Sequence, residues 1–252
     1  MGKSIAVAGK GGTGKSTIAA LLVLELCRLR QGPVLAIDAD PDANLGTLLG
    51  IKPQQSVGDL REDVLKEIKN FPAGMSKAAY VEAGLHQIIA EADGFDLITM
   101  GKGEGAGCYC YLNSLIRKFS DDLMPSYSWI VIDNEAGLEH ISRRTTTRID
   151  ALLIVVNDNP ISLQTAQTII AVVDSLKNEV RRKYLVTNML REKYKAPILE
   201  RIKGLSAAYL CDIPADAGLD EIIFQGESLQ KLNHSPVHKS ITLIIDTIGG
   251  LS

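Results

Sequence analysis

The sequence predicts an α/β protein with a doubly wound, mostly parallel sheet flanked by helices. Short apolar runs alternate with longer amphipathic segments along most of the chain, which is typical of a parallel sheet wrapped by helices. Most of the apolar runs also lack a clean period of two, as expected for strands that are covered on both faces. We expect one domain over residues 1–252.

The apolar runs give the strands, and the amphipathic segments give the helices. The expected strands are Ser4–Ala8, Val34–Asp38, Leu97–Met100, Trp129–Asp133, Ala151–Val156, Tyr184–Thr187 and Ala208–Cys211. The first helix should run from about Lys15 to Arg30, because apolar residues recur on one side and Gly32-Pro33 stops it. The same periodicity predicts helices over Val57–Ile68, Ala78–Ala92, Leu112–Leu123, Ser162–Leu176 and Ser235–Ser252.

A glycine-rich turn joins the first strand to the first helix in the spacing of a P-loop. Its glycines let backbone N–H groups turn toward a polyphosphate, and the helix N-terminus adds positive potential. We expect the turn to bind ATP or ADP, with Lys15 on the phosphates as a catalytic residue and the Ser16 hydroxyl on Mg²⁺. A glycine turn without a ligand is the alternative. The nucleotide-binding segment is Gly9, Lys10, Gly11, Gly12, Thr13, Gly14, Lys15, Ser16 and Thr17.

A second lysine, Lys10, lies inside this turn. From Lys10 to Ser16 the chain resembles the deviant Walker A subfamily of P-loop ATPases (SIMIBI type), which includes the nitrogenase iron protein, MinD/ParA-type ATPases and metallocentre maturation factors. The resemblance implies a homodimer in which Lys10 reaches the nucleotide of the partner subunit and assists hydrolysis. A solvated loop cation is the alternative interpretation of Lys10.

Carboxylates follow two of the expected strands, at the sheet edge where open α/β sheets bind ligands. The segment Asp38–Asn44 resembles the switch I of the same subfamily. By that resemblance Asp40 orients or deprotonates the attacking water and Asp38 helps to hold the water shell of Mg²⁺. An acidic turn before a helix is the alternative. Asp133 ends a Walker B strand and should complete the magnesium environment.

Other expected nucleotide contacts come from the resemblance. Switch II is Asn134–Gly137, where the Gly137 N–H can sense the γ-phosphate. Asn188 would read adenine, and the turn with Pro214 and Asp216 would close the other side of the base.

Cys108 and Cys110 follow a glycine-rich segment and precede an amphipathic helix, whose N-terminus favours thiolates. In an extended segment residues i and i+2 point the same way, so both sulfurs could face one metal ion. A metal ion bound by thiolates is usually four-coordinate, so two ligands are missing, and the same two cysteines of the second subunit in a two-fold dimer would supply them. A strained disulfide between the two and a pair of structural thiols are the alternatives.

The run Gly105–Asn113, the P-loop and Glu135–His140 together resemble the CooC and AcsF family of carbon monoxide dehydrogenase and acetyl-CoA synthase maturation ATPases. The resemblance implies a slow ATPase that binds Ni²⁺, and also Zn²⁺, through Cys108 and Cys110 of both subunits. Its client would be a nickel enzyme, carbon monoxide dehydrogenase or acetyl-CoA synthase, to which it delivers the metal. Three rivals remain: a MinD/ParA-like positioning ATPase, a [4Fe–4S] redox donor, and a nucleotide-binding adaptor without turnover.

Composition restricts the partners. The 252 residues carry a formal net charge of −3 and no broad basic field, so we expect no nucleic-acid partner. No window approaches the roughly 18 apolar residues of a membrane span, and the last helix lacks a basic face. We therefore expect no membrane partner and a cytoplasmic location. Cys27 and Cys211 lie in apolar segments as small buried residues, so a disulfide framework is not expected.

Overall fold

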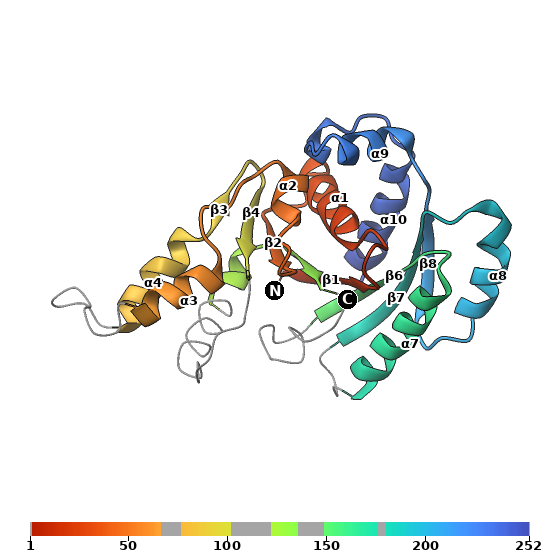
Figure 1. Ribbon diagram of the computed structural model, residues 1–252, viewed down its shortest axis with the longest axis horizontal. Helices are drawn as coiled ribbons and strands as arrows, with labels where there is room; N and C mark the ends of the chain where they lie inside the picture. The colour runs from red at the N-terminus through yellow and green to blue at the C-terminus, as the bar shows by residue number, and fades with distance from the viewer. Residues whose placement is uncertain (1, 67–76, 102–121, 136–148, 176–179, 252) are drawn as a thin grey trace.

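The structure, a computed structural model, describes residues 2–66, 77–101, 122–135, 149–175 and 180–251 (Figure 1). Its centre is an eight-stranded sheet in the order β3-β4-β2-β5-β1-β6-β7-β8. Neighbouring strands pair in parallel, except that β3 and β4 are antiparallel. The strands are β1 (Lys3–Gly9), β2 (Val34–Ala39), β3 (Ala90–Glu91), β4 (Phe95–Thr99), β5 (Trp129–Asn134), β6 (Ile149–Val156), β7 (Val180–Asn188) and β8 (Ala208–Ile213).

Helices cover both faces of this sheet. One face carries α1 (Lys15–Arg28), α2 (Leu45–Leu49), α9 (Ala217–Phe224) and α10 (Val237–Gly249). The other carries α3 (Val57–Lys66), α4 (Lys77–Gln87), α7 (Pro160–Ser175) and α8 (Glu192–Ile202). Short 3-10 turns are η1 (Met124–Ser126) and η2 (Leu229–Lys231). No helix in these described ranges is long and apolar enough to cross a membrane.

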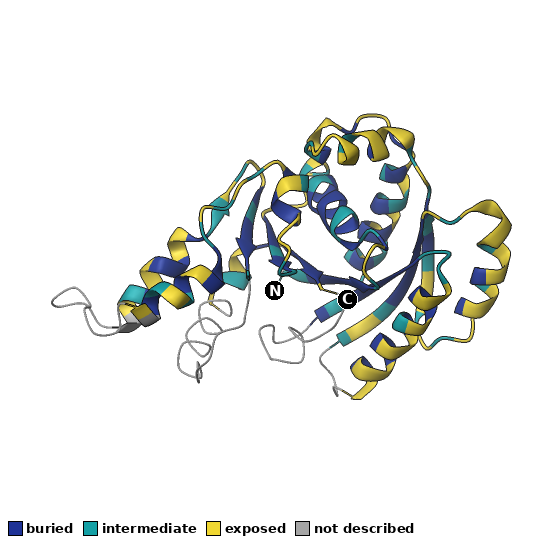
Figure 2. Cartoon of the chain, viewed as in Figure 1, coloured by how far each residue is buried: buried dark blue, intermediate teal, exposed yellow. Residues whose placement is uncertain are grey.

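The strands are buried from both sides, as the missing period of two predicts. In β1, Ile5 and Val7 pack in the core beneath α1, while Ala6 and Ala8 pack in the core on the opposite face. Figure 2 shows the sheet buried between helices whose outer sides are exposed. The doubly wound fold and all seven expected strands are therefore confirmed, each strand within a few residues of its expected ends.

Several helix boundaries differ from the prediction. The helix expected over Ala78–Ala92 ends at Gln87, and the chain then forms β3. It turns back through Gly94, which has a φ of +87°, and the Ala92 N–H donates to the Phe95 carbonyl at 2.9 Å. This hairpin places a short antiparallel strand at the edge of the sheet, so the residues after Gln87 pair with β4 instead of extending the helix.

Helices α2, α8 and α9 were not predicted. The first and last of these are brief, with 5 residues in α2 and 8 in α9, and α8 contains Pro197. The first helix ends at Arg28, slightly before its predicted end. Arg30 adopts a φ of +52°, and the Gln31 N–H reaches back to the Leu26 carbonyl at 3.1 Å. This hydrogen bond closes the last turn of the helix before Gly32. The helix expected behind Cys110 lies almost wholly outside the described residues.

A buried carboxylate joins α1 to α10. Glu25 is 2% exposed, and its oxygens accept hydrogen bonds from the Arg28 guanidinium at 2.8 and 2.5 Å and from the Thr242 hydroxyl at 2.6 Å. The His238 ring lies 3.2 Å away. Burial acts to raise the pKa of Glu25, but the bonds from Arg28 and Thr242 outweigh it and lower that pKa. Glu25 is thus held as a satisfied anion.

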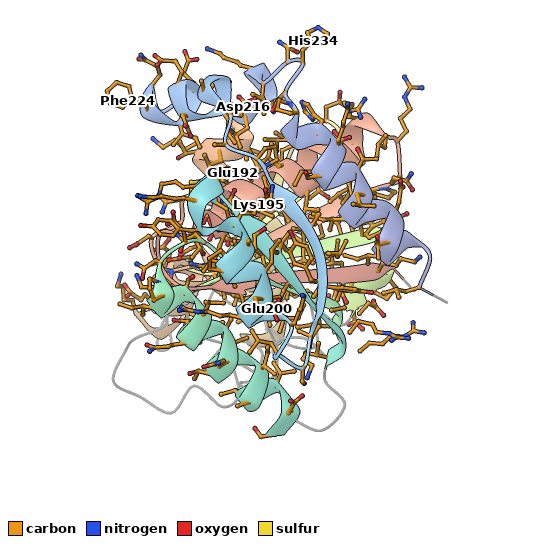
Figure 3. The ribbon with its side chains drawn as sticks, turned by 90° about the vertical axis from the view of Figure 1, so that its right-hand side faces the viewer. Glu192, Lys195, Glu200, Asp216, Phe224 and His234 are labelled. Atoms are coloured by element: carbon orange, nitrogen blue, oxygen red, sulfur yellow. The ribbon has the colours of Figure 1, made fainter. Side chains whose placement is uncertain are left out.

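We expect Glu25→Gln to lower the free energy of unfolding by roughly 2–3 kcal/mol, because the new amide NH₂ faces groups that are themselves donors. Urea unfolding measures the loss. Glu200→Gln is the matched control, since Glu200 pairs with Lys203 at 2.7 Å on the exposed side of α8 (Figure 3), and it should change stability by less than about 0.5 kcal/mol. Equal losses in the two variants would contradict a structural role for the buried cluster.

Candidate functional site

The glycine-rich turn after β1 is shaped by two close approaches. A Cβ on Gly9 would lie 2.6 Å from the Val155 carbonyl oxygen of β6. A Cβ on Gly14 would lie 2.4 Å from Nδ2 of Asn188, and Gly14 also has a φ of +89°. No side chain fits at either position, so glycine is required where the loop leaves the sheet and where it enters α1.

Buried hydrogen bonds hold the turn from inside. Thr13 is fully buried, and its hydroxyl donates to the Lys10 carbonyl at 2.8 Å. The Asn188 amide, at the end of β7, donates to the Thr13 carbonyl at 2.8 Å. On the outer side, a Cβ on Gly11 or Gly12 would meet nothing within 4 Å. The loop is therefore anchored from the sheet and bare on the side that a polyphosphate would occupy.

The two lysines of the turn have different surroundings. Lys15, in the first turn of α1, is 7% exposed, and its ammonium has no hydrogen-bond or ion-pair partner among the described residues. Lys10 is less buried, and among the described residues its ammonium reaches only the Gly11 carbonyl, 3.5 Å away at the surface. Lys15 is thus placed to offset the charge of phosphates bound in its own loop, whereas Lys10 is directed toward solvent.

Two buried carboxylates stand side by side next to this loop. Asp38 of β2 and Asp133 of β5 are paired in the sheet register, and both are fully buried. The Asp38 carboxylate accepts the N–H groups of Asp40 and Leu45 at 3.2 and 3.0 Å. Neither oxygen of Asp133 has a geometrically well-formed hydrogen bond within the described ranges. A buried carboxylate without partners is costly, so Asp133 is incomplete without another group.

Burial raises the pKa of Asp133 to about 7; the Ser16 hydroxyl and Lys15 act against this rise, and Asp38 and Asp40 add to it. Burial likewise raises the pKa of Asp38 to about 6, although its backbone hydrogen bonds lower it. The Ser16 hydroxyl therefore lies near the Asp133 carboxylate.

These oxygens fit a magnesium ion, which prefers oxygen ligands and keeps several waters and substrate phosphates. The residues that would hold it are Ser16, Asp133 and, through water, Asp38. When bound, the ion would neutralise charge on the phosphates during phosphoryl transfer. Within the described ranges, no group of three or more His, Cys, Asp or Glu side chains could hold a metal by itself.

Some of the other predicted site residues form hydrogen bonds within the protein. The Asp40 carboxylate accepts the Asp42 N–H at 3.0 Å, and its action on water stays a prediction. Asp216 caps α9 by accepting the Leu219 N–H at 2.7 Å, and its other oxygen accepts the Ser235 hydroxyl at 2.9 Å (Figure 3). The adenine contacts of Asn188, Pro214 and Asp216 also stay predictions.

Asn134, the first residue of the predicted switch II, forms a hydrogen bond that the sequence did not indicate. It is fully buried, and its amide donates to the Val7 carbonyl at 3.2 Å, just before the P-loop. This bond ties the end of β5 to the end of β1. Because the two strands are 120 or more residues apart in the chain, only the strand order reveals it. Gly137 lies outside the described residues.

The predicted metal ligands Cys108 and Cys110 also lie outside the described residues. Of the cysteines inside them, Cys211 is buried and Cys27 is partly buried, and both are free thiols. Burial raises the pKa of each to about 11, with Asp93 adding to the effect at Cys27 and Asp212 at Cys211. Both thiols therefore stay protonated near neutral pH and are poor metal ligands, as expected for structural cysteines.

Comparison with known proteins agrees with this geometry. Residues 4–229 match the CobQ/CobB/MinD/ParA nucleotide binding domain. An uncharacterised ATP-binding protein of Methanocaldococcus jannaschii is 35% identical over 247 residues, which are 97% of each chain. The carbon monoxide dehydrogenase accessory protein CooC of Rhodospirillum rubrum is 34% identical over 176 residues, 66% of each chain. A ParA family ATPase structure from Chlorobium tepidum has a TM-score of 0.73 at 21% identity, with both chains fully covered. The chain therefore belongs to the CobQ/CobB/MinD/ParA family of nucleotide-binding proteins.

Proposed function

We propose that this protein is a slow, homodimeric cytoplasmic ATPase that helps to insert nickel into carbon monoxide dehydrogenase or acetyl-CoA synthase. The nickel ion is its cargo, held by Cys108 and Cys110 of both subunits, with Zn²⁺ as an alternative occupant. The similarity to an accessory protein of carbon monoxide dehydrogenase supports the client, and the Cys-x-Cys spacing supports a thiolate site.

The observation that carries the proposal is the backbone link between the magnesium face and the cysteine segment. The Met100 N–H donates to the Asp38 carbonyl at 2.8 Å, and the Met100 carbonyl accepts the Gly58 N–H at 3.0 Å. The segment that contains both cysteines begins at the next residue, Gly101. A displacement of Asp38 on nucleotide binding would therefore be passed through one hydrogen bond to Met100, the residue that precedes the cysteine segment.

The residues of the site have separate tasks in ATP hydrolysis. Lys15 and the backbone of the P-loop bind the phosphates and offset their charge. Asp40, which follows Asp38 at the same sheet edge, orients the attacking water. Lys10 acts on the nucleotide of the partner subunit, so hydrolysis requires the dimer. Loss of the γ-phosphate then removes negative charge beside Asp38, and this change releases or loads the cargo through Met100.

The test is a titration of the metal-free protein with Ni²⁺, with and without ATP. Because two thiolates leave a four-coordinate ion unsatisfied, binding should saturate at one ion per dimer, with a thiolate charge-transfer band and metal-induced dimerisation. The Cys108→Ser, Cys110→Ser double variant should lose both while it keeps ATP binding. Cys27→Ser is the matched control and should keep both, since that thiol is partly buried and bonded to the Gly94 carbonyl.

Two results would count against this function. The first is a double variant that still binds one Ni²⁺ per dimer with wild-type affinity, which would remove the cysteines from the site. The second is a brown purified protein that carries four irons per dimer, which would indicate a [4Fe–4S] redox donor instead.

A further inference from the structure

Thr99, the last residue of β4, is buried, and its hydroxyl is unpaired within the described part of the chain. The residue is 5% exposed, and no described residue forms a hydrogen bond with its hydroxyl oxygen. Valine has nearly the same shape and would occupy this position without a buried polar atom. Because an unpaired buried hydroxyl costs free energy, its presence indicates a partner other than the described residues, such as water or a ligand shell.

The direction of this side chain follows from β4 itself. Phe95 and Leu97 pack in the core beneath α1, and Ile98 packs in the core on the opposite face. Side chains alternate along a strand, so Thr99 lies on the α1 side of the sheet. That is the side on which Asp133 lies close to Ser16 and Lys15.

The sheet register then places Thr99 in the row of magnesium-site carboxylates. Thr99 is the register partner of Asp38, and Asp38 is the register partner of Asp133. Neighbouring strands lie about 4.8 Å apart, so the Thr99 hydroxyl and the Asp38 carboxylate are separated by roughly the width of one water molecule. Each Asp38 oxygen accepts one backbone N–H, and a carboxylate oxygen can accept a further hydrogen bond.

We propose that Thr99 is a positioning residue of the magnesium–nucleotide site, which donates through one ordered water to the Asp38 carboxylate and holds it toward the water shell of Mg²⁺. Thr99 touches neither the nucleotide nor the ion. It also immediately precedes Met100, so the residue that orients Asp38 lies on the strand from which the cysteine segment leaves. The inference rests on the magnesium site of the ATP-binding fold and is independent of nickel.

The experiment measures how much Mg²⁺ is needed for half-maximal binding of a fluorescent, non-hydrolysable ATP analogue at equilibrium. We expect Thr99→Val to raise this concentration roughly five- to tenfold, the effect of one lost hydrogen bond, and to leave binding in EDTA unchanged. Thr99→Ser keeps the hydroxyl and should stay within about twofold of wild type. Thr168→Val, on α7, removes a hydroxyl that bonds to the Gln164 carbonyl and should have no effect.

A Mg²⁺ requirement within about twofold of wild type in Thr99→Val would overturn the proposal. Asp133→Asn, measured in parallel, separates the causes: if it raises the requirement and Thr99→Val does not, only the role of Thr99 is wrong. If neither variant raises it, the magnesium site is wrong and the role of Thr99 falls with it. Circular dichroism checks folding, and Thr99→Ala replaces Thr99→Val with the same expected outcomes if the valine variant does not fold.

Discussion

Lys10→Ala is expected to bind ATP almost as well as the wild-type protein and to hydrolyse it roughly a thousandfold more slowly. The Lys10 ammonium lies at the surface, where its one hydrogen bond to a described residue goes to the Gly11 carbonyl, so we expect it to add little to binding in its own loop. A cation supplied by a partner subunit stabilises the charge that develops on the transferred phosphoryl group, and such residues contribute about 10³–10⁵ to turnover. Phosphate release and equilibrium nucleotide binding measure the two effects separately.

Lys15→Ala is the contrasting variant. Lys15 is buried in the first turn of α1, and its ammonium has no hydrogen-bond or ion-pair partner in the described part of the chain, so its removal should abolish phosphate-dependent binding as well as turnover. Lys239→Ala, which changes an exposed lysine of α10, is the neutral control and should alter neither. Hydrolysis by Lys10→Ala at the wild-type rate would contradict a role for Lys10 in the reaction.

Mixing variants tests whether Lys10 acts across the dimer. A Lys10→Ala subunit keeps Asp40, and an Asp40→Asn subunit keeps Lys10, so a mixed dimer has one complete site only if Lys10 acts on the partner's nucleotide. Equal mixing makes half of the dimers mixed, and each has one active site of two, so about a quarter of the wild-type rate should return. If Lys10 acts within its own subunit, no mixture recovers activity.

The parts of this molecule that were predicted from sequence carry local signals. The P-loop is contiguous, and the buried strands appear as apolar runs because both faces of each strand are covered by helices. Asp38 and Asp133 could be assigned to strand ends for the same reason. The edge strand β3 was missed because its two paired residues continue an apolar helical pattern, and only the hairpin at Gly94 reveals it.

The parts that were missed depend on strand order and on packing between distant segments. β5 lies between β2 and β1, and this order is what places Asp133 beside Asp38 and lets Asn134 reach the Val7 carbonyl. Nothing local in the sequence distinguishes Thr99 from any threonine at the end of a strand. The buried Glu25 likewise appears as an ordinary charged helical residue until α10 packs against it.

Asp133→Asn is expected to abolish Mg²⁺-dependent ATP hydrolysis and, at the same time, to stabilise the protein in the absence of magnesium. The carboxylate is fully buried and has no well-formed hydrogen bond to the residues that the structure describes, so its charge costs free energy until a cation is bound. Asparagine has nearly the same shape without the charge. At pH 7.5 in EDTA the gain should be roughly 2–4 kcal/mol, which raises the melting temperature by several degrees.

The pH dependence gives the sign of this effect. Burial raises the pKa of Asp133 to about 7 in the folded protein, whereas the unfolded chain releases the proton near the ordinary value of 3.8. Below about pH 3.8 the carboxyl is protonated in both the folded and the unfolded state and does not affect stability. As the pH rises toward 7, the unfolded state releases this proton first, so the free energy of unfolding falls, and the fall is complete above about pH 7. The stability difference between Asp133→Asn and wild type should therefore grow from near zero at pH 4 to its full value above pH 7.

Thermal unfolding across this pH range measures the stability difference. Saturating Mg²⁺ and ATP should reverse the order of stability of the two proteins, since only wild type binds both. A variant that is less stable than wild type in EDTA at pH 7.5 would show that the buried carboxylate has a partner.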